Sequence, residues 1–73
     1  MDQTMVGKLG RVSGTVQPGF LGEVMVPVRG GVEAFHARSE SGQEIFAIGD
    51  RVRVVEYNPP RSVVVAALVA ADS

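Results

Sequence analysis

The chain has 73 residues, with 7 basic and 8 acidic side chains, a net charge of −1, and no cysteine. This length predicts a single domain over residues 1–73, with a folded core of about 6–68. The absence of cysteine excludes disulfides, thiolate zinc sites and thiol catalysis. The lack of a basic excess removes most of the electrostatic support for non-specific nucleic-acid binding, so no nucleic-acid partner is expected.

Hydropathy gives no membrane segment in the sequence. The longest apolar run, residues 63–71, is well short of the roughly 18 residues that a spanning helix needs. The first five residues have neither the basic nor the apolar region of a signal peptide. We therefore expect the chain as given to be a soluble domain.

Nine glycines and four prolines separate short valine-rich segments along the whole chain. This spacing predicts an all-β sandwich or barrel, which we interpret as five strands. The first strand is expected over residues 6–16. Gly10 and Gly14 lie inside it, where glycine often marks a bend or bulge. Gln17, Pro18 and Gly19 then form a turn.

The second predicted strand covers residues 22–29, with Val24, Val26 and Val28 on its core face. Pro27 has no amide proton to donate, so this strand should lie at an edge or be unpaired on that side at that point. The pair Gly30-Gly31 predicts a tight hairpin. The third strand, residues 32–38, has no purely apolar face, so we expect a bulge or twist in it.

Residues 44–48 are expected to form a short turn or a single 3₁₀ turn that plugs one barrel end, because the segment is too short for a regular helix. The turn Gly49-Asp50 begins the fourth strand, residues 51–57, which places Val52 and Val54 on the core face. The fifth strand, residues 62–68, is apolar on both faces. Such a run fits a fully buried strand, or a strand that pairs with another subunit.

No catalytic, cofactor-binding or metal site is predicted, and no small-molecule ligand is expected. His36 is the only histidine, and the sequence contains no G-x-S-x-G elbow. We interpret His36 as a structural or surface residue, and a small hydrolase centred on it is the weaker alternative. Glu23 and Glu33 flank the hairpin and could form a carboxylate pair, but solvated edge carboxylates are favoured.

Phe20 and Leu21 occupy the glycine-bounded turn Pro18-Gly-Phe-Leu-Gly22. An exposed Phe20-Leu21 tip would contact a protein or a membrane surface, and a tip folded over the barrel is equally consistent with the sequence. Arg51 and Arg53 alternate with the core valines of the fourth strand, so they face outward. We propose Phe20, Leu21, Arg51 and Arg53 as a candidate partner-facing surface.

Six elements, in this order, resemble the C-terminal soluble domain of NfeD-like proteins: Gly7-Lys-Leu-Gly10, Pro18-Gly19, Gly22-Glu-Val-Met-Val26, Phe35-His-Ala-Arg-Ser39, Ile48-Gly-Asp-Arg-Val-Arg-Val-Val-Glu-Tyr57 and Val63-Val-Val65. The resemblance covers about residues 6–68. It implies a small five-stranded OB-like barrel that is attached to transmembrane helices in the parent protein, which would be in the cell membrane. Pro59-Pro60 departs from the flexible polar hairpin expected at that point.

The resemblance also implies a function. It suggests a non-catalytic protein-interaction barrel that acts with membrane scaffold proteins of the stomatin, prohibitin or flotillin type. A homo-oligomer is a further possible state. The alternative, from fold-level analogy alone, is an OB-fold module that binds single-stranded nucleic acid.

Overall fold

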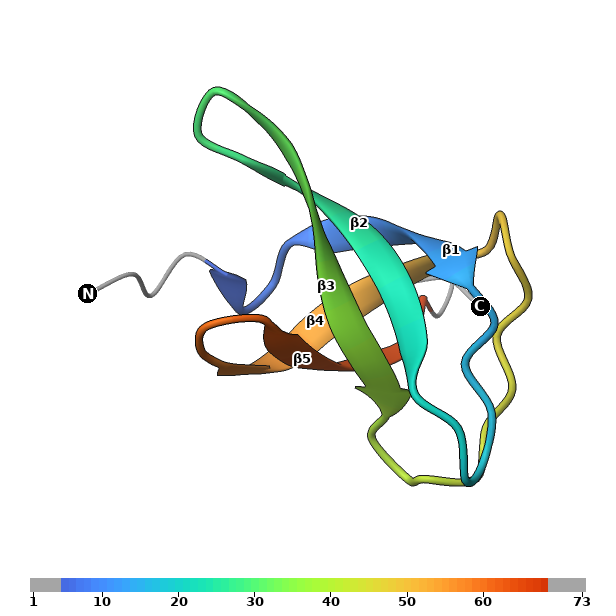
Figure 1. Ribbon diagram of the computed structural model, residues 1–73. Coiled ribbons are helices and arrows are strands. Elements are labelled where there is room, and N and C mark those ends of the chain that lie inside the picture. The colour runs from blue at the N-terminus through green and yellow to red at the C-terminus, as the bar shows by residue number, and fades with distance from the viewer. Residues whose placement is uncertain (1–4, 69–73) are drawn as a thin grey trace.

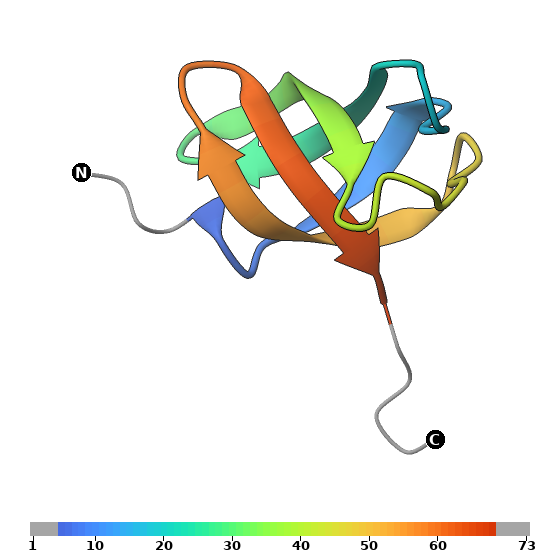
Figure 2. The same ribbon diagram turned by 90° about the horizontal axis from the view of Figure 1, so that it is seen from below.

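The computed structural model describes residues 5–68, which form five strands and no α-helix. The strands are β1 (Leu9–Gly14), β2 (Gly22–Val28), β3 (Gly31–Ser39), β4 (Arg51–Asn58) and β5 (Ser62–Ala67). They close into a barrel in the order β1-β2-β3-β5-β4 (Figures 1 and 2). Neighbouring strands are antiparallel except β3 and β5, which are parallel. The predicted all-β, five-stranded barrel is confirmed.

Valine fills most of the barrel interior. The eight largest side chains with almost no exposed surface are all valines. Two come from each of β2, β4 and β5, one from β1, and one from the residues just after β1: Val12, Val16, Val24, Val26, Val52, Val54, Val63 and Val65. Alternation along β1, β2, β4 and β5 places seven of them inward, because successive side chains point to opposite faces of a sheet. Val16 follows β1 and is held by its bridge with Phe46. β-branched side chains suit this position, since they pack well on a pleated surface with little loss of rotamer freedom.

The first strand is shorter than residues 6–16. Before it, Met5 to Gly7 form a turn, in which the Lys8 amide donates to the Met5 carbonyl at 3.1 Å and Gly7 takes a φ of +97°. Near the end of β1, the register with β2 shifts between Val12 and Gly14, as the glycine there predicted. The chain then leaves β2, and Val16 forms an isolated bridge with Phe46 instead.

The β2–β3 hairpin turns at Gly30, which has a φ of +81°, and Figure 1 shows it projecting beyond the rest of the barrel. Of the bulge or twist expected in β3, the bulge is wrong, because seven successive pairs join β2 and β3 in one register. The mixture of apolar and polar residues on each face of β3 has another cause. Val32 lies in the projecting part of the hairpin, away from the core, and is 57% exposed. Pro27 pairs with Val32, while the pairing of β2 with β1 reaches only to Met25, so Pro27 is unpaired on its β1 side.

Residues 44–46 are extended and form neither the short turn nor the single 3₁₀ turn expected there; the chain turns only at residues 47–50, just before β4. Phe46 does plug the barrel end and is 7% exposed, whereas Ile45 and Ile48 are each 66% exposed. Two backbone hydrogen bonds between Val16 and Phe46, at 3.0 and 2.9 Å, hold the segment extended. Backbone pairing of Phe46 with the distant residue Val16 therefore overrides the local preference for a turn.

The fifth strand is not fully buried. Val63 and Val65 are buried, but Val64 and Ala66 face outward and are only half-buried. β5 lies between β3 and β4 and closes the barrel (Figure 2), so its partners are within the same chain.

Candidate functional site

The β1–β2 loop holds Phe20 and Leu21 on the surface of the molecule. Phe20 and Leu21 are 66% and 62% exposed, so the tip of the loop is exposed and is not folded over the barrel. The loop is nevertheless well defined: Gly19 takes a φ of +82°, and the Phe20 amide donates to the Gln17 carbonyl at 3.1 Å. A fixed turn thus exposes an aromatic and an aliphatic side chain at adjacent positions.

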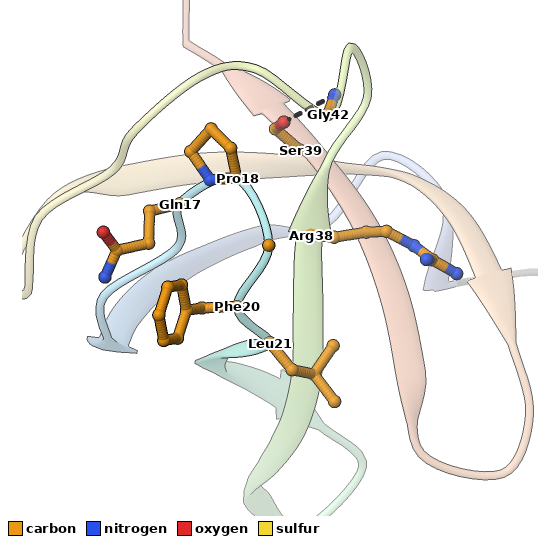
Figure 3. A pocket seen from close by; sticks show the side chains of 8 residues that line it. Gln17, Pro18, Phe20, Leu21, Arg38, Ser39 and Gly42 are labelled. Atoms are coloured by element: carbon orange, nitrogen blue, oxygen red, sulfur yellow. Dashed lines mark hydrogen bonds between the residues drawn. The ribbon is translucent and has the colours of Figure 1, made fainter.

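A cavity of about 350 Å³ lies beside this turn, between the β1–β2 loop and the end of β3. Figure 3 shows Phe20 and Leu21 pointing to opposite sides of the loop, with the Arg38 side chain extending away from the Phe20 ring. Ser39 is buried at the far side, where its Oγ accepts a hydrogen bond from the Gly42 amide at 2.8 Å (Figure 3). We call this cavity, with Phe20 and Leu21, the loop surface.

The loop surface continues onto the β3–β4 loop. The Val16–Phe46 bridge brings the two loops side by side, as Figure 1 shows in cyan and yellow. Ile45 and Ile48 flank Phe46 in sequence and are both exposed. Large apolar side chains at one barrel end are therefore supplied by two loops.

Arg51 and Arg53 lie elsewhere, on the outer wall of the barrel. Both are exposed on β4, where Arg51 pairs with Arg11 and Arg53 pairs with Leu9 of β1. Arg51 lines a second cavity, also of about 350 Å³, which shares no lining residue with the first. The four candidate residues thus form two separate surfaces, and the sequence alone could not show that separation.

The residues considered for catalysis do not converge on a reactive centre. Glu23 pairs with His36 across β2 and β3, and its Oε1 accepts a hydrogen bond from Ser13 Oγ at 2.7 Å. A nucleophilic serine would instead donate to a histidine base. Glu33 pairs with Val26, three positions away from the Glu23 pair, so the two carboxylates do not face each other. Within residues 5–68, no group of three or more potential metal ligands comes together.

The aromatic side chains on the strands are packed inward. Phe35 is buried, and the Tyr57 ring meets it edge-on with centroids 6.2 Å apart and an interplanar angle of 85°. Barrels that bind single strands stack bases on exposed aromatic faces. Phe20 is the exposed ring in the described part of the chain, and it lies on a loop. The geometry therefore gives the nucleic-acid alternative no support from stacking.

Two of the most similar solved structures are themselves soluble domains. The soluble domain of the NfeD protein YuaF from Bacillus subtilis is 32% identical, with a TM-score of 0.67, over 81% of this chain and 68% of that chain. The soluble domain of a Corynebacterium glutamicum membrane protein implicated in regulation of membrane protease activity is 24% identical, with a TM-score of 0.75, over 92% and 97%. The second likeness concerns the fold alone.

A third neighbour is the C-terminal domain of stomatin operon partner protein 1510-C from Pyrococcus horikoshii. It is 28% identical, with a TM-score of 0.69, over 96% of this chain and 97% of that chain. Comparison with curated proteins gives no match. In the described part of the chain, no helix is long and apolar enough to cross a bilayer.

A family model gives the decisive match. The model for the NfeD C-terminal domain aligns with residues 9–66, which run from the first residue of β1 almost to the end of β5. The match therefore includes every strand of the barrel and both loops of the loop surface. The chain belongs to the NfeD C-terminal domain family.

Proposed function

We propose that this chain is a non-catalytic interaction barrel of an NfeD-like membrane protein, and that it acts with membrane scaffold proteins of the stomatin, prohibitin or flotillin type. Family membership supports the first part. One relative is named a stomatin operon partner, which supports the second part.

The exposed pair Phe20 and Leu21 is the observation that carries the proposal. Both side chains are about two-thirds exposed on a turn that is fixed by backbone hydrogen bonding and by the positive φ of Gly19. Large apolar side chains grouped on a soluble surface mark contact sites, because leaving them in water costs free energy that a partner recovers. A prearranged turn also limits the ordering cost of binding.

Co-purification with the stomatin-type protein of the same organism, in buffer and in detergent, tests the proposal. Replacing both residues (F20S/L21S) should weaken binding about 30-fold, because aromatic and aliphatic anchors at interface centres carry most of the binding energy. Folding should be unaffected, since both side chains are exposed.

The matched control is Val6→Ser, which removes another exposed apolar side chain (56%) outside both cavities. It should bind like the unaltered chain. Absence of binding to any scaffold protein, with and without detergent, would contradict the proposal. The homo-oligomer stays a prediction, which light scattering can measure independently.

A further inference from the structure

The outer wall of the barrel carries a second surface, which we call the arginine groove. It is the 350 Å³ cavity lined chiefly by Leu9, Arg11, Met25, Pro27, Val32 and Arg51, contributed by β1, β2, β3 and β4. None of the residues that line it carries a carboxylate. The groove is therefore locally basic in a chain whose net charge is −1.

The arginines are placed where they repel each other. Arg11 and Arg51 are direct partners in the antiparallel pairing of β1 and β4, and Arg53 lies on the same outer face two residues beyond Arg51. Like charges directly opposite each other destabilise a sheet. A bound anionic group would relieve this repulsion.

The floor of the groove is apolar and open. Leu9 is 47% exposed and Val32 is 57% exposed, and Met25 and Pro27 lie between them on β2. Pro27 and Val32 line the groove from the β2–β3 hairpin, which projects beyond the rest of the barrel (Figure 1). An apolar floor with arginines at one side fits a ligand that has an apolar face and acidic flanks.

Three features limit the kind of partner that can bind in the arginine groove. Every described strand has a partner on both sides in the closed barrel, so a partner chain could add a strand only along the projecting β2–β3 hairpin. The surface is hollowed, which suits a protein segment better than a planar bilayer. From β4 to β3 the groove crosses three strand spacings, about 14 Å along the sheet, which is wider than the roughly 10 Å diameter of a helix.

We propose that the arginine groove binds an acidic amphipathic helix of a protein partner, with its apolar side chains on Leu9, Met25 and Val32 and its carboxylates on Arg11 and Arg51. Guanidinium groups hold carboxylates through two parallel hydrogen bonds, which an ammonium group cannot do. This proposal rests on the proposed function as an interaction module, but it uses a different surface from Phe20 and Leu21.

The probe is a synthetic peptide of roughly 18 residues, long enough to form a helix, with leucine along one face and glutamate on both flanks. A second peptide carries lysine in place of glutamate. Fluorescence anisotropy should show binding of the glutamate peptide only, weakened by added salt. Amide chemical shifts should change at Leu9, Arg11, Met25, Val32 and Arg51.

Arg51→Glu is the critical variant. It should lower affinity for the glutamate peptide about tenfold, the loss expected for one charge-assisted hydrogen-bonded contact. Its melting temperature should stay the same or rise, because the introduced carboxylate would face the opposite charge of Arg11. Val32→Ser, which alters the exposed floor, should also weaken binding. The control Arg61→Glu makes the same charge change in the β4–β5 turn. It removes one exposed hydrogen bond, from Arg61 to the Ala34 carbonyl at 3.3 Å, and should bind normally.

Several results would overturn the proposal. These are no binding of the glutamate peptide at millimolar concentration, equal binding of the lysine peptide, or unchanged affinity in Arg51→Glu. Arginine-dependent binding to vesicles of phosphatidylserine and phosphatidylcholine, or to oligothymidylate, without peptide binding would also overturn it. The scaffold co-purification tests Phe20 and Leu21, whereas the peptide measurement tests the arginine groove. Failure of one proposal can therefore be distinguished from failure of the other.

Discussion

At the residue scale, Gly22 is the glycine with the least space around it. It begins β2 directly beneath the segment that follows β1. A Cβ atom there would lie 2.6 Å from Val16 Cγ2, 2.7 Å from the Gly14 carbonyl oxygen and 2.8 Å from the Thr15 carbonyl oxygen. Two of these neighbours are backbone atoms, so a side chain could be accepted only if the chain moved. Gly22 also follows Leu21 directly, so it fixes where the β1–β2 loop ends and β2 begins.

Gly22→Ala should therefore destabilise the protein by about 1–3 kcal/mol, the usual cost of overpacking a close contact. Chemical denaturation measures the change in unfolding free energy. Gly31→Ala is the matched control, because a Cβ at Gly31 meets no atom within 4 Å and Gly31 does not take a positive φ. It should be neutral or slightly stabilising. Equal losses in the two variants would show that backbone freedom, and not crowding, decides both.

At the element scale, the turn before β4 is built by one carboxylate. Asp50 Oδ2 accepts a hydrogen bond from the Ala47 amide at 2.9 Å, and the Asp50 amide donates to the Ala47 carbonyl at 2.9 Å. The Gly49 amide donates to the Val12 carbonyl at 2.8 Å, which joins the turn to β1. Gly49 reaches this geometry with a φ of +99°, where other residues are strained.

Asp50→Ala should cost about 0.5–1.5 kcal/mol of stability, because it removes one side-chain hydrogen bond that organises the turn. Thermal unfolding followed by circular dichroism tests this. Glu44→Ala changes an exposed carboxylate in the same loop and should alter stability by less than about 0.5 kcal/mol. A similar loss in Glu44→Ala would mean that loop charge matters, and not the Asp50 hydrogen bond.

The elements differ in how far local pattern could predict them. The Gly30-Gly31 hairpin and the Gly49-Asp50 turn are as expected, because turn chemistry depends on adjacent residues. The path of residues 44–48 could not be predicted, since the bridge between Val16 and Phe46 joins positions 30 residues apart. The β3 bulge was wrong for a similar reason. The mixed pattern of that strand reflects its projection beyond the core, which no local sequence signal encodes.

At the scale of the whole molecule, the barrel depends on β5 to close. This strand pairs with β3 in parallel and with β4 in antiparallel order, so it completes the ring of hydrogen bonds and supplies Val63 and Val65 to the core. A 73-residue chain has little stability to spare, because small domains bury a modest share of their surface. Loss of packing in β5 should therefore lower the unfolding free energy of the whole domain.

Val65→Ala should destabilise the domain by about 2–3 kcal/mol, from lost apolar burial and the cavity left behind. In a domain of this size, that should lower the melting temperature by roughly 10 °C or more. Val64→Ala is the control from the next position, where the side chain faces outward and is half-buried, and it should cost less than about 1 kcal/mol. Calorimetry compares the two variants; comparable losses would contradict an alternating β5.

Some features of the candidate site could be predicted from the sequence, and others required the structure. The outward direction of Arg51 and Arg53 followed from alternation with Val52 and Val54, since a strand's period of two is local. Exposure of Phe20 did not follow, because a loop can lie over or away from a core. Arg11 was not singled out as a site residue, although its alternation with Val12 already placed it on the outer face. Only the β1–β4 register, a long-range pairing, brings it opposite Arg51.

The sequence by itself determined the all-β class, the turns, the valine core faces and the family resemblance, because each depends on residue type and short-range spacing. The tertiary structure alone decided how the barrel closes, where β1 ends, and which exposed side chains share a surface. It placed Phe20 and Leu21 on a loop at one barrel end, and Arg11 and Arg51 together on the wall. These relations join residues that are far apart in the chain, so they depend on strand register and barrel closure, which no local pattern specifies.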